Sequence, residues 1–207
     1  MPKTPRDFYT ELGAEWLAQR KNKKYTRSEL AYISRLLNKG TRVLDLACGY
    51  GRFSIPLAEM GYLVNGIDIT PIFIDRAKEE ARRRDLRIEF RVGDMRNILY
   101  RDASFDYVIC MWNAFSEITI ESEQIRTIHE IYRVLKRGGL AIIEVRNHRS
   151  SKVIEKNFID GQEAMPSYNH TRGSLKKLMK LAKIHDFKVF IDKFGGRNRL
   201  FLEVMKP

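Results

Sequence analysis

The chain has 207 residues, 43% of them hydrophobic, which is enough for one domain with a full-sized core. Its longest apolar runs fall far short of the roughly 20 residues that span a bilayer, which argues against a membrane protein. The polar N-terminal sequence lacks the features of a signal peptide, and only two cysteines are present. We therefore expect a cytoplasmic protein without a disulfide framework.

The formal net charge of +12 is concentrated in two segments. Residues 1–40 hold nine Lys and Arg against four Asp and Glu, and residues 146–188 hold ten against four. Residues 41–145 are close to neutral, with fifteen basic and sixteen acidic side chains. A basic surface can attract nucleic acid or an anionic substrate. It is equally typical of a solubilising surface or of a heat-adapted protein.

The first forty residues predict two helices that form an N-terminal cap. From about residue 7 to residue 19, apolar side chains recur at helical spacing. A second helix begins near Thr26 or Ser28 and ends shortly before Gly40.

Strands alternate with helices over the next hundred residues. The strands are predicted at 42–46, 63–68, 87–92, 105–111 and 140–145, and the helices at 53–60, 71–84 and 122–135. This alternation indicates βαβ units, and therefore a parallel sheet with right-handed crossovers.

The pattern changes after residue 145. A loop-rich stretch at about 146–172 precedes a basic helix at 175–185. Two final strands, at 188–194 and 199–205, are joined by a short connection that contains Gly195 and Gly196. Because so short a connection joins only antiparallel neighbours, the chain is expected to end in an antiparallel hairpin.

A glycine-bearing turn follows the first strand, in the sequence DLACGYG at 45–51. Gly49 and Gly51 allow the backbone to turn tightly and to approach a ligand without a Cβ atom in the way. The helix that follows presents free N–H groups at its start. Open parallel sheets bind ligands beyond the carboxyl ends of their strands, so this turn is a candidate binding site.

Acidic residues follow the next two strands. Asp68 ends the second strand, where a carboxylate can accept both hydroxyls of a ribose. After the third strand comes Gly93-Asp94-Met95, in which Asp94 can accept a hydrogen bond from an exocyclic amine and Met95 offers an apolar face to a flat ring. Each feature alone is also typical of a helix cap or a turn. The three features, however, follow the first, second and third strands in the order in which a glycine turn, a ribose-binding carboxylate and an adenine-binding segment would be required.

Asp45 favours an adenosine cofactor other than a dinucleotide. It precedes Gly49 by four residues, and a carboxylate there suits an ammonium group better than a pyrophosphate. Ser54 is small enough to leave the dinucleotide pattern open, whereas no P-loop Lys-Ser/Thr follows the glycines.

These features resemble the successive motifs of the class I S-adenosylmethionine-dependent methyltransferases. The matching segments are VLDLACGYG at 43–51, GID at 66–68, GDM at 93–95, FDYVI at 105–109 and LKRGG at 135–139. The resemblance implies an α/β fold of three layers: a Rossmann-like, seven-stranded, mostly parallel sheet with an antiparallel C-terminal hairpin and an N-terminal helical cap. The whole chain would be one methyltransferase domain, with the cap at 1–40, the cofactor-binding core at 41–145 and a substrate-side segment at 146–207.

The resemblance also implies how S-adenosylmethionine, and the product S-adenosylhomocysteine, would bind. Asp45 would help to hold the amino group, and Gly49 and Gly51 would pass under the methionine part. Asp68 would bind the ribose, and Asp94 and Met95 would lie at the adenine. The remaining expected cofactor contacts are Ala47, Ile69, Gly93, Met111 and Trp112.

Methyl transfer from a sulfonium is a direct displacement, so alignment and the exclusion of water matter more than a catalytic side chain. A general base is needed only for an acceptor that is protonated at the working pH, and His148 is the candidate. A loop histidine is more often solvated or structural. No His/Cys cluster has the spacing of metal ligands, so we expect no metal.

The expected acceptor contacts come from the segments around the core. They are Tyr9 and Tyr25 in the cap, Trp112 and Asn113 after the fourth strand, and Arg146 and Arg149 after the fifth. The sequence CMWNA at 110–114 lacks the Asn/Asp-Pro-Pro-aromatic run of enzymes that methylate amide or adenine nitrogens.

Three functions are compatible with these features. We favour methyl transfer to a nitrogen or oxygen atom of a small molecule. An RNA or ribosomal methyltransferase is the alternative, supported by the basic flanks and by the lysine face of residues 174–183. A non-catalytic homologue that keeps the fold for binding is the third. No oligomeric state is predicted.

Overall fold

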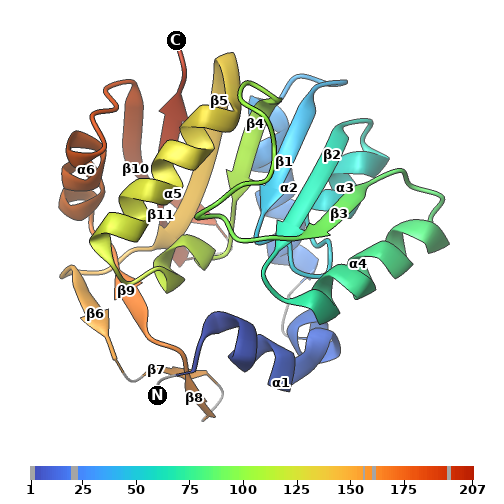
Figure 1. The fold of residues 1–207 in the computed structure, drawn as a ribbon, viewed down its shortest axis with the longest axis horizontal. Helices are drawn as coiled ribbons and strands as arrows, with labels where there is room; N and C mark the ends of the chain where they lie inside the picture. The colour runs from blue at the N-terminus through green and yellow to red at the C-terminus, as the bar shows by residue number, and fades with distance from the viewer. Residues whose placement is uncertain (1–2, 20–22, 156, 160–161, 195–196) are drawn as a thin grey trace.

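A seven-stranded sheet forms the centre of the computed structural model, which describes residues 3–19, 23–155, 157–159, 162–194 and 197–207 (Figure 1). The strands lie in the order β10-β11-β5-β4-β1-β2-β3. Their bounds are β1 Arg42–Leu46, β2 Leu63–Asp68, β3 Glu89–Val92, β4 Phe105–Cys110, β5 Leu135–Arg146, β10 Phe187–Phe194 and β11 Arg197–Met205. Strand β11 pairs antiparallel with β5 and β10, whereas β1 to β5 pair in parallel. The predicted mostly parallel sheet with antiparallel C-terminal pairing is therefore confirmed.

Helices cover both faces of this sheet. α5 (Glu121–Val134) and α6 (Arg172–Leu181) pack on one face, and α2 (Lys23–Leu36) and α3 (Ser54–Glu59) on the other, with α4 (Pro71–Arg83) beside α3. Val43 and Leu44, neighbours on β1, are both fully buried, but Val43 packs towards α2 and α3 and Leu44 towards α5 and α6. Successive side chains of a strand point to opposite faces, so a strand that is apolar on both sides requires these three layers.

The helix α1 (Pro5–Gln19) lies at the lower edge of the sheet in Figure 1, where the parallel strands end. It is interrupted at Gly13, whose φ of 79° and ψ of 163° are not helical. An ion pair of 3.2 Å between Glu15 and Arg76 joins α1 to α4. The cap therefore covers the edge of the sheet at which ligands of such folds bind.

The segment that was predicted to be loop-rich contains four short strands. β6 (Lys152–Ile154) pairs with β9 (Ser167–Asn169), and β7 (Asn157–Ile159) pairs with β8 (Gln162–Ala164). Each strand has three residues, which is too short for a period of two to be recognised in the sequence. Ala164, the last residue of β8, and Met165 after it pack against Phe8 of α1, so the cap and the substrate-side segment meet.

Several predicted boundaries were wrong, among them the start of α2, which lies at Lys23 instead of near Thr26 or Ser28. β5 begins at Leu135 rather than Leu140, because Leu135 already pairs with Phe105 before the register shifts. α6 begins at Arg172, because the side chains of Thr171 and Ser174 form a capping box. β3 begins at Glu89 instead of residue 87.

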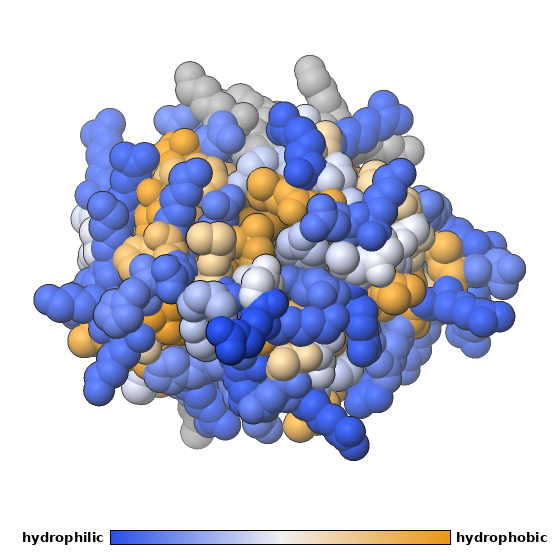
Figure 2. All heavy atoms as spheres, turned by 90° about the horizontal axis from the view of Figure 1, so that it is seen from above, coloured by the Kyte–Doolittle hydropathy of each residue, from blue (hydrophilic) through white to orange (hydrophobic). Residues whose placement is uncertain are grey.

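The helix α6 also ends earlier than predicted, at Leu181, just before Lys183 adopts a left-handed φ of 55°. The expected hairpin glycines, Gly195 and Gly196, lie outside the described residues. No described helix is long and apolar enough to cross a membrane. On the face shown in Figure 2, hydrophilic side chains surround small, separate apolar patches.

Candidate active site

The turn after β1 has three backbone positions in the left-handed region. Ala47, Gly49 and Gly51 have φ values of 55°, 57° and 87°. A Cβ atom at Gly51 would lie 2.9 Å from Cδ1 of Ile55, which is closer than side chains tolerate. Glycine at this position therefore satisfies both the dihedral angle and the packing of α3.

Asp68, at the end of β2, holds this turn in place. Its Oδ2 accepts a hydrogen bond from the Gly49 N–H at 2.9 Å, and its Oδ1 accepts one from the Thr70 N–H at 2.8 Å. The carboxyl group is buried, and burial raises its pKa even though both N–H groups oppose that rise. Asp68, which is predicted to bind the ribose, is thus in direct contact with the glycine turn that is predicted to bind the methionine part of the cofactor.

Asp45 lies beneath the same turn and is 1% exposed. Its Oδ2 accepts a hydrogen bond of 2.6 Å from the Ser54 hydroxyl, and no described cation forms an ion pair with it. Burial raises the pKa of Asp45 to about 7, and the nearby Asp68 adds to the effect. A buried carboxyl group without a cation is a strong site for an ammonium group, which would supply the missing charge.

Arg52, directly after the turn, has a buried donor nitrogen that lacks an acceptor among the described residues. Its Nη2 pairs with Glu29 of α2 and its Nε donates to the Thr26 hydroxyl at 3.1 Å. Its Nη1 is buried and has no acceptor among the described residues. A buried carboxyl group without a described cation partner and a guanidinium nitrogen without a described acceptor flank one turn, and the ammonium and carboxylate of an amino acid fit these two groups.

The segment after β3 is arranged differently from the expectation for an adenine site. Asp94 forms an ion pair of 2.6 Å with Arg96, which also pairs with Glu123 of α5 at 2.9 Å. Burial opposes ionisation of Asp94, but the hydrogen bonds from Arg96 outweigh it and lower its pKa. Met95 and Ile69 are half-buried, and the N–H of Gly93 donates to the Asp68 carbonyl at 2.9 Å.

The residues after β4 depart from ordinary backbone geometry. Trp112 and Asn113 have φ values of 63° and 69°, although neither is glycine, and Met111 before them is buried. Such strain persists only where the surroundings impose it, and it is frequent at functional sites. Here the Trp112 N–H donates to Glu144 Oε2 at 2.6 Å, and Asn113 Oδ1 accepts from the Arg146 N–H and from the Ser116 hydroxyl.

A buried ionic network surrounds the indole of Trp112, and sequence reasoning missed it. Arg199 of β11 pairs with Glu29 at 2.8 Å and with Glu144 at 3.1 Å. The Trp112 Nε1 donates to Glu29 at 3.0 Å, and the Arg52 guanidinium lies 4.4 Å from the indole ring. The one signal in the sequence was Glu144, a carboxylate within the apolar strand AIIEV.

Of the two predicted cap residues, Tyr9 reaches the site. Its hydroxyl donates to Glu117 Oε1 at 2.7 Å, in the single turn η1 (Ala114–Glu117) that follows β4, and its ring lies 5.7 Å from that of Phe73. Farther along α1, Leu17 would meet a Cβ at Gly49 at 3.7 Å. The side chain of Tyr25 lies outside the described part of the chain.

The segment after β5 presents one partly buried histidine between two exposed arginines. Arg146 and Arg149 are exposed, whereas His148 is half-buried with Nε2 unpaired among the described residues. Burial, followed by the charge of Arg146, lowers the pKa of His148. Beside it lies His170, a fully buried histidine that sequence reasoning did not select.

The comparisons with known proteins agree with this geometry. The methyltransferase domain family matches residues 43–139. YqeM of Bacillus subtilis, whose name assigns it only provisionally to the methyltransferases, is 32% identical over 77% of this chain and 64% of its own length. A glycine/sarcosine N-methyltransferase of Parasynechococcus marenigrum is 38% identical over 56% of this chain and 42% of its own length.

Among solved structures, the PH0226 protein of Pyrococcus horikoshii matches with a TM-score of 0.73 and 26% identity, covering 91% of this chain and 93% of that one. The fold, the glycine turn and the acidic strand ends are those expected of a nucleoside-binding α/β protein. With these matches, residues 43–139 form a methyltransferase domain of the class I S-adenosylmethionine-dependent type. It spans less than two thirds of the length of the curated relatives named above.

Proposed function

We propose that the protein transfers the methyl group of S-adenosylmethionine to a nitrogen or oxygen atom of a small molecule. The observation that carries the cofactor assignment is the buried Asp45 carboxyl group, which has no cation partner among the described residues, together with the buried Arg52 Nη1, which has no acceptor there. Asp68 supports the ribose assignment, because it is fixed at the end of β2 beside that turn.

The cofactor supplies an activated methyl group, so the protein has to align the cofactor with the acceptor and to exclude water from both. Asp45 would bind the amino group and Arg52 the carboxylate, while Asp68 would accept from the ribose hydroxyls. Asp94 is already engaged by Arg96, so an adenine amine would share its carboxylate oxygens with that guanidinium. Gly93, Ile69 and Met95 would border the base.

Enclosure of the strand ends supports a small acceptor. Tyr9 donates to Glu117, and Phe8 packs against Met165, so segments that precede and follow the parallel strands meet over the end of β4. A closed edge excludes water and admits small molecules more readily than a folded RNA. The name of the glycine/sarcosine N-methyltransferase relative points the same way.

His148 is our candidate general base, since an imidazole of lowered pKa is neutral at pH 7 and its unpaired Nε2 can accept a proton. Trp112, Asn113, Arg146 and Arg149 would border the acceptor. We also assign the protein to the reducing cytoplasm, because Cys48 and Cys110 are buried free thiols.

RNA methylation is the second candidate, favoured by the exposed lysines of α6, Lys176, Lys177 and Lys180. The test is methyl transfer from labelled S-adenosylmethionine to a panel of amines, phenols and amino acids, in parallel with total RNA at low and high salt. Labelling of a small molecule supports the proposal. Salt-sensitive labelling of RNA alone would replace it with the second candidate, and cofactor binding without labelling of any acceptor would favour a non-catalytic homologue.

A further inference from the structure

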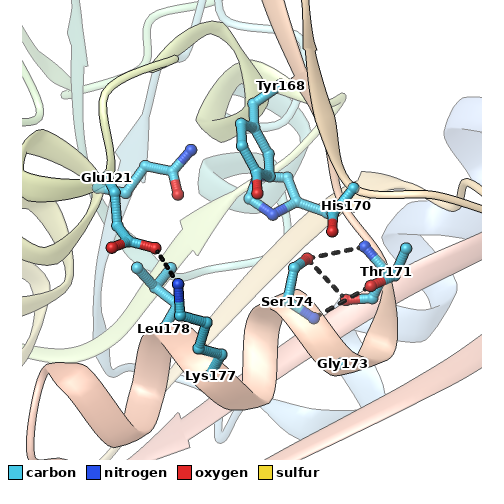
Figure 3. A pocket seen from close by; sticks show the side chains of 10 residues that line it. Glu121, Tyr168, His170, Thr171, Gly173, Ser174, Lys177 and Leu178 are labelled. Carbon is cyan, nitrogen blue, oxygen red and sulfur yellow. Dashed lines mark hydrogen bonds and ion pairs between the residues drawn. The ribbon is translucent and has the colours of Figure 1, made fainter.

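A pocket separate from the glycine turn lies on the α5–α6 side of the sheet. Its volume is about 300 Å³, and Figure 3 shows it from close by. It is bordered by the start of α5, the start of α6 and strand β9, and its lining residues include Glu121, Gln124, Tyr168, His170, Ser174 and Lys177. None of these residues has a role in the proposed methyl transfer.

His170 is the feature of this pocket that calls for a ligand. The side chain is 1% exposed, yet neither ring nitrogen has a hydrogen-bond partner among the described residues. Its ring contacts Tyr168 at 4.8 Å and Phe115 at 5.6 Å between centroids, and in Figure 3 it faces the space bounded by Glu121 and Leu178. A buried imidazole with both nitrogens unpaired is costly, so a hydrogen-bonding group that enters the pocket would be favoured there.

The start of α6 supplies hydrogen-bond donors at the same place. The side chains of Thr171 and Ser174 form the capping box, and the Ser174 N–H donates to the Thr171 hydroxyl. The N–H of Gly173 lies before the first hydrogen bond of the helix, so no helical carbonyl accepts from it. The first turn of this ten-residue helix contains no acidic residue. Its positive end is therefore not neutralised by its own side chains, and such an end favours an anion.

The charged side chains at the pocket are few and partly balanced. Glu121 of α5 and Lys177 of α6 form an ion pair of 3.0 Å, which Figure 3 marks with a dashed line. Tyr168 on β9 and His148 after β5 are the other titratable groups that face His170. Among the described residues, no group of three His, Cys, Asp or Glu side chains is suited to a metal ion.

We propose that this pocket binds one anionic group, a carboxylate or a phosphate, held by His170, by the N-terminal amides of α6 and by Lys177. The anion replaces Glu121 as the partner of Lys177 and gives one His170 nitrogen an acceptor. Burial holds the pKa of free His170 at about 4, so at neutral pH the imidazole donates its single N–H, and anion binding raises that pKa.

The test is an NMR titration of the full chain with inorganic phosphate, acetate and methyl phosphate at constant ionic strength, with chloride as the reference. The imidazole of His170 and the amide of Gly173 are the reporters. We expect saturable shifts with millimolar ligand and a rise of the His170 pKa. Stronger binding of methyl phosphate or acetate than of phosphate would identify an organic acid or ester as the ligand, and the reverse order would identify the free ion.

Charge variants separate this site from general attraction to a basic surface. Lys177→Gln should weaken binding about tenfold, the loss expected for one charge-assisted hydrogen bond, and Glu121→Gln should tighten it. Lys176→Gln is the matched control, since Lys176 is an exposed neighbour that does not line the pocket. His170→Phe, which keeps the ring packing, should also weaken binding as read at Gly173.

Two results would overturn the proposal. One is the absence of saturation beyond that seen with chloride. The other is an equal loss of affinity in Lys176→Gln and Lys177→Gln. Because the readout is binding of simple anions, failure of the methyltransferase assignment leaves this test unaffected.

Discussion

The indole Nε1 of Trp112 donates a hydrogen bond to Glu29 Oε1 at 3.0 Å, joining the end of β4 to helix α2 of the cap. Glu29 is 1% exposed and also pairs with Arg52 and Arg199. The segment after β4, the glycine turn and strand β11 therefore share one buried carboxylate.

Glu29→Gln should destabilise the protein by about 3–5 kcal/mol, because it leaves the buried Arg52 and the largely buried Arg199 with a single carboxylate, Glu144. Urea unfolding followed by circular dichroism measures the change. Glu11→Gln is the control: its pair with Lys3 is exposed, and its loss should cost less than about 1 kcal/mol. Equal effects of the two substitutions would contradict the role of the network.

Asp68→Ala should weaken S-adenosylmethionine binding at least about tenfold, since it removes both the ribose acceptor and the anchor of the Gly49 N–H. Titration calorimetry with S-adenosylmethionine and with NAD is the measurement. Asp75→Asn, an exposed carboxylate on α4, should leave the affinity unchanged. Preferential binding of NAD by the wild type would refute the cofactor assignment.

Cofactor binding should strengthen as the pH rises towards about 7 and then level off. Burial raises the pKa of Asp45 to about 7, so below that pH the carboxyl group is largely neutral and must release a proton to pair with the ammonium group. Calorimetry in two buffers of different ionisation enthalpy measures the proton released. In Asp45→Asn this release should vanish; its persistence would assign the titration to another group.

The same raised pKa affects stability. The neutral carboxyl group is favoured in the folded state, so the unfolding free energy without ligand should fall as the pH rises from about 4 to 7. Asp45→Asn should show a smaller fall over that window. Denaturant midpoints of both proteins across the window provide the comparison, and parallel curves would show that Asp45 does not titrate there.

Tyr9→Phe should accelerate cofactor release about fivefold, because it removes one hydrogen bond to Glu117 and keeps the ring against Phe73. Stopped-flow fluorescence measures the release rate. Tyr100→Phe, far from the cap, serves as the control, and an unchanged rate in Tyr9→Phe would mean that α1 does not retain the cofactor.

His148→Asn should lower kcat by a factor of about 10² or more while the affinity for S-adenosylmethionine stays the same. The wild-type rate should fall at acid pH, where the imidazole becomes protonated, and this fall should be absent in the variant. A pH–rate profile with an identified acceptor provides the check. Unchanged turnover would show that solvent, and not His148, takes the proton from the acceptor.

The sequence was informative wherever one local signal was sufficient. β1, β2 and α4 occur close to their predicted limits, because their apolar periods and the Pro71 start are properties of neighbouring residues. The turn at Gly49 and the position of Asp68 follow from the same pattern. Their contact required only that parallel strands end at one edge.

The features that were missed depend on residues far apart in the chain. Glu144 meets Arg199 only because β5 and β11 are neighbours, and this pairing is not encoded near either residue. The ladder of β6 and β9 joins two three-residue strands across an intervening hairpin. His170 gave no signal, because its burial arises from Phe115 and Tyr168 together.

The ionic network around Trp112 also constrains how this sequence can change over time. Two carboxylates, Glu29 and Glu144, balance two guanidinium groups, Arg52 and Arg199, and all of these side chains except Arg199 are buried. Loss of one of these side chains leaves an opposite charge without a partner, whereas replacement of an acid and a base together by apolar residues is tolerated. Across related lineages these four positions should therefore mutate in pairs of opposite charge, and such covariation would record the contact between the cap and the terminal hairpin.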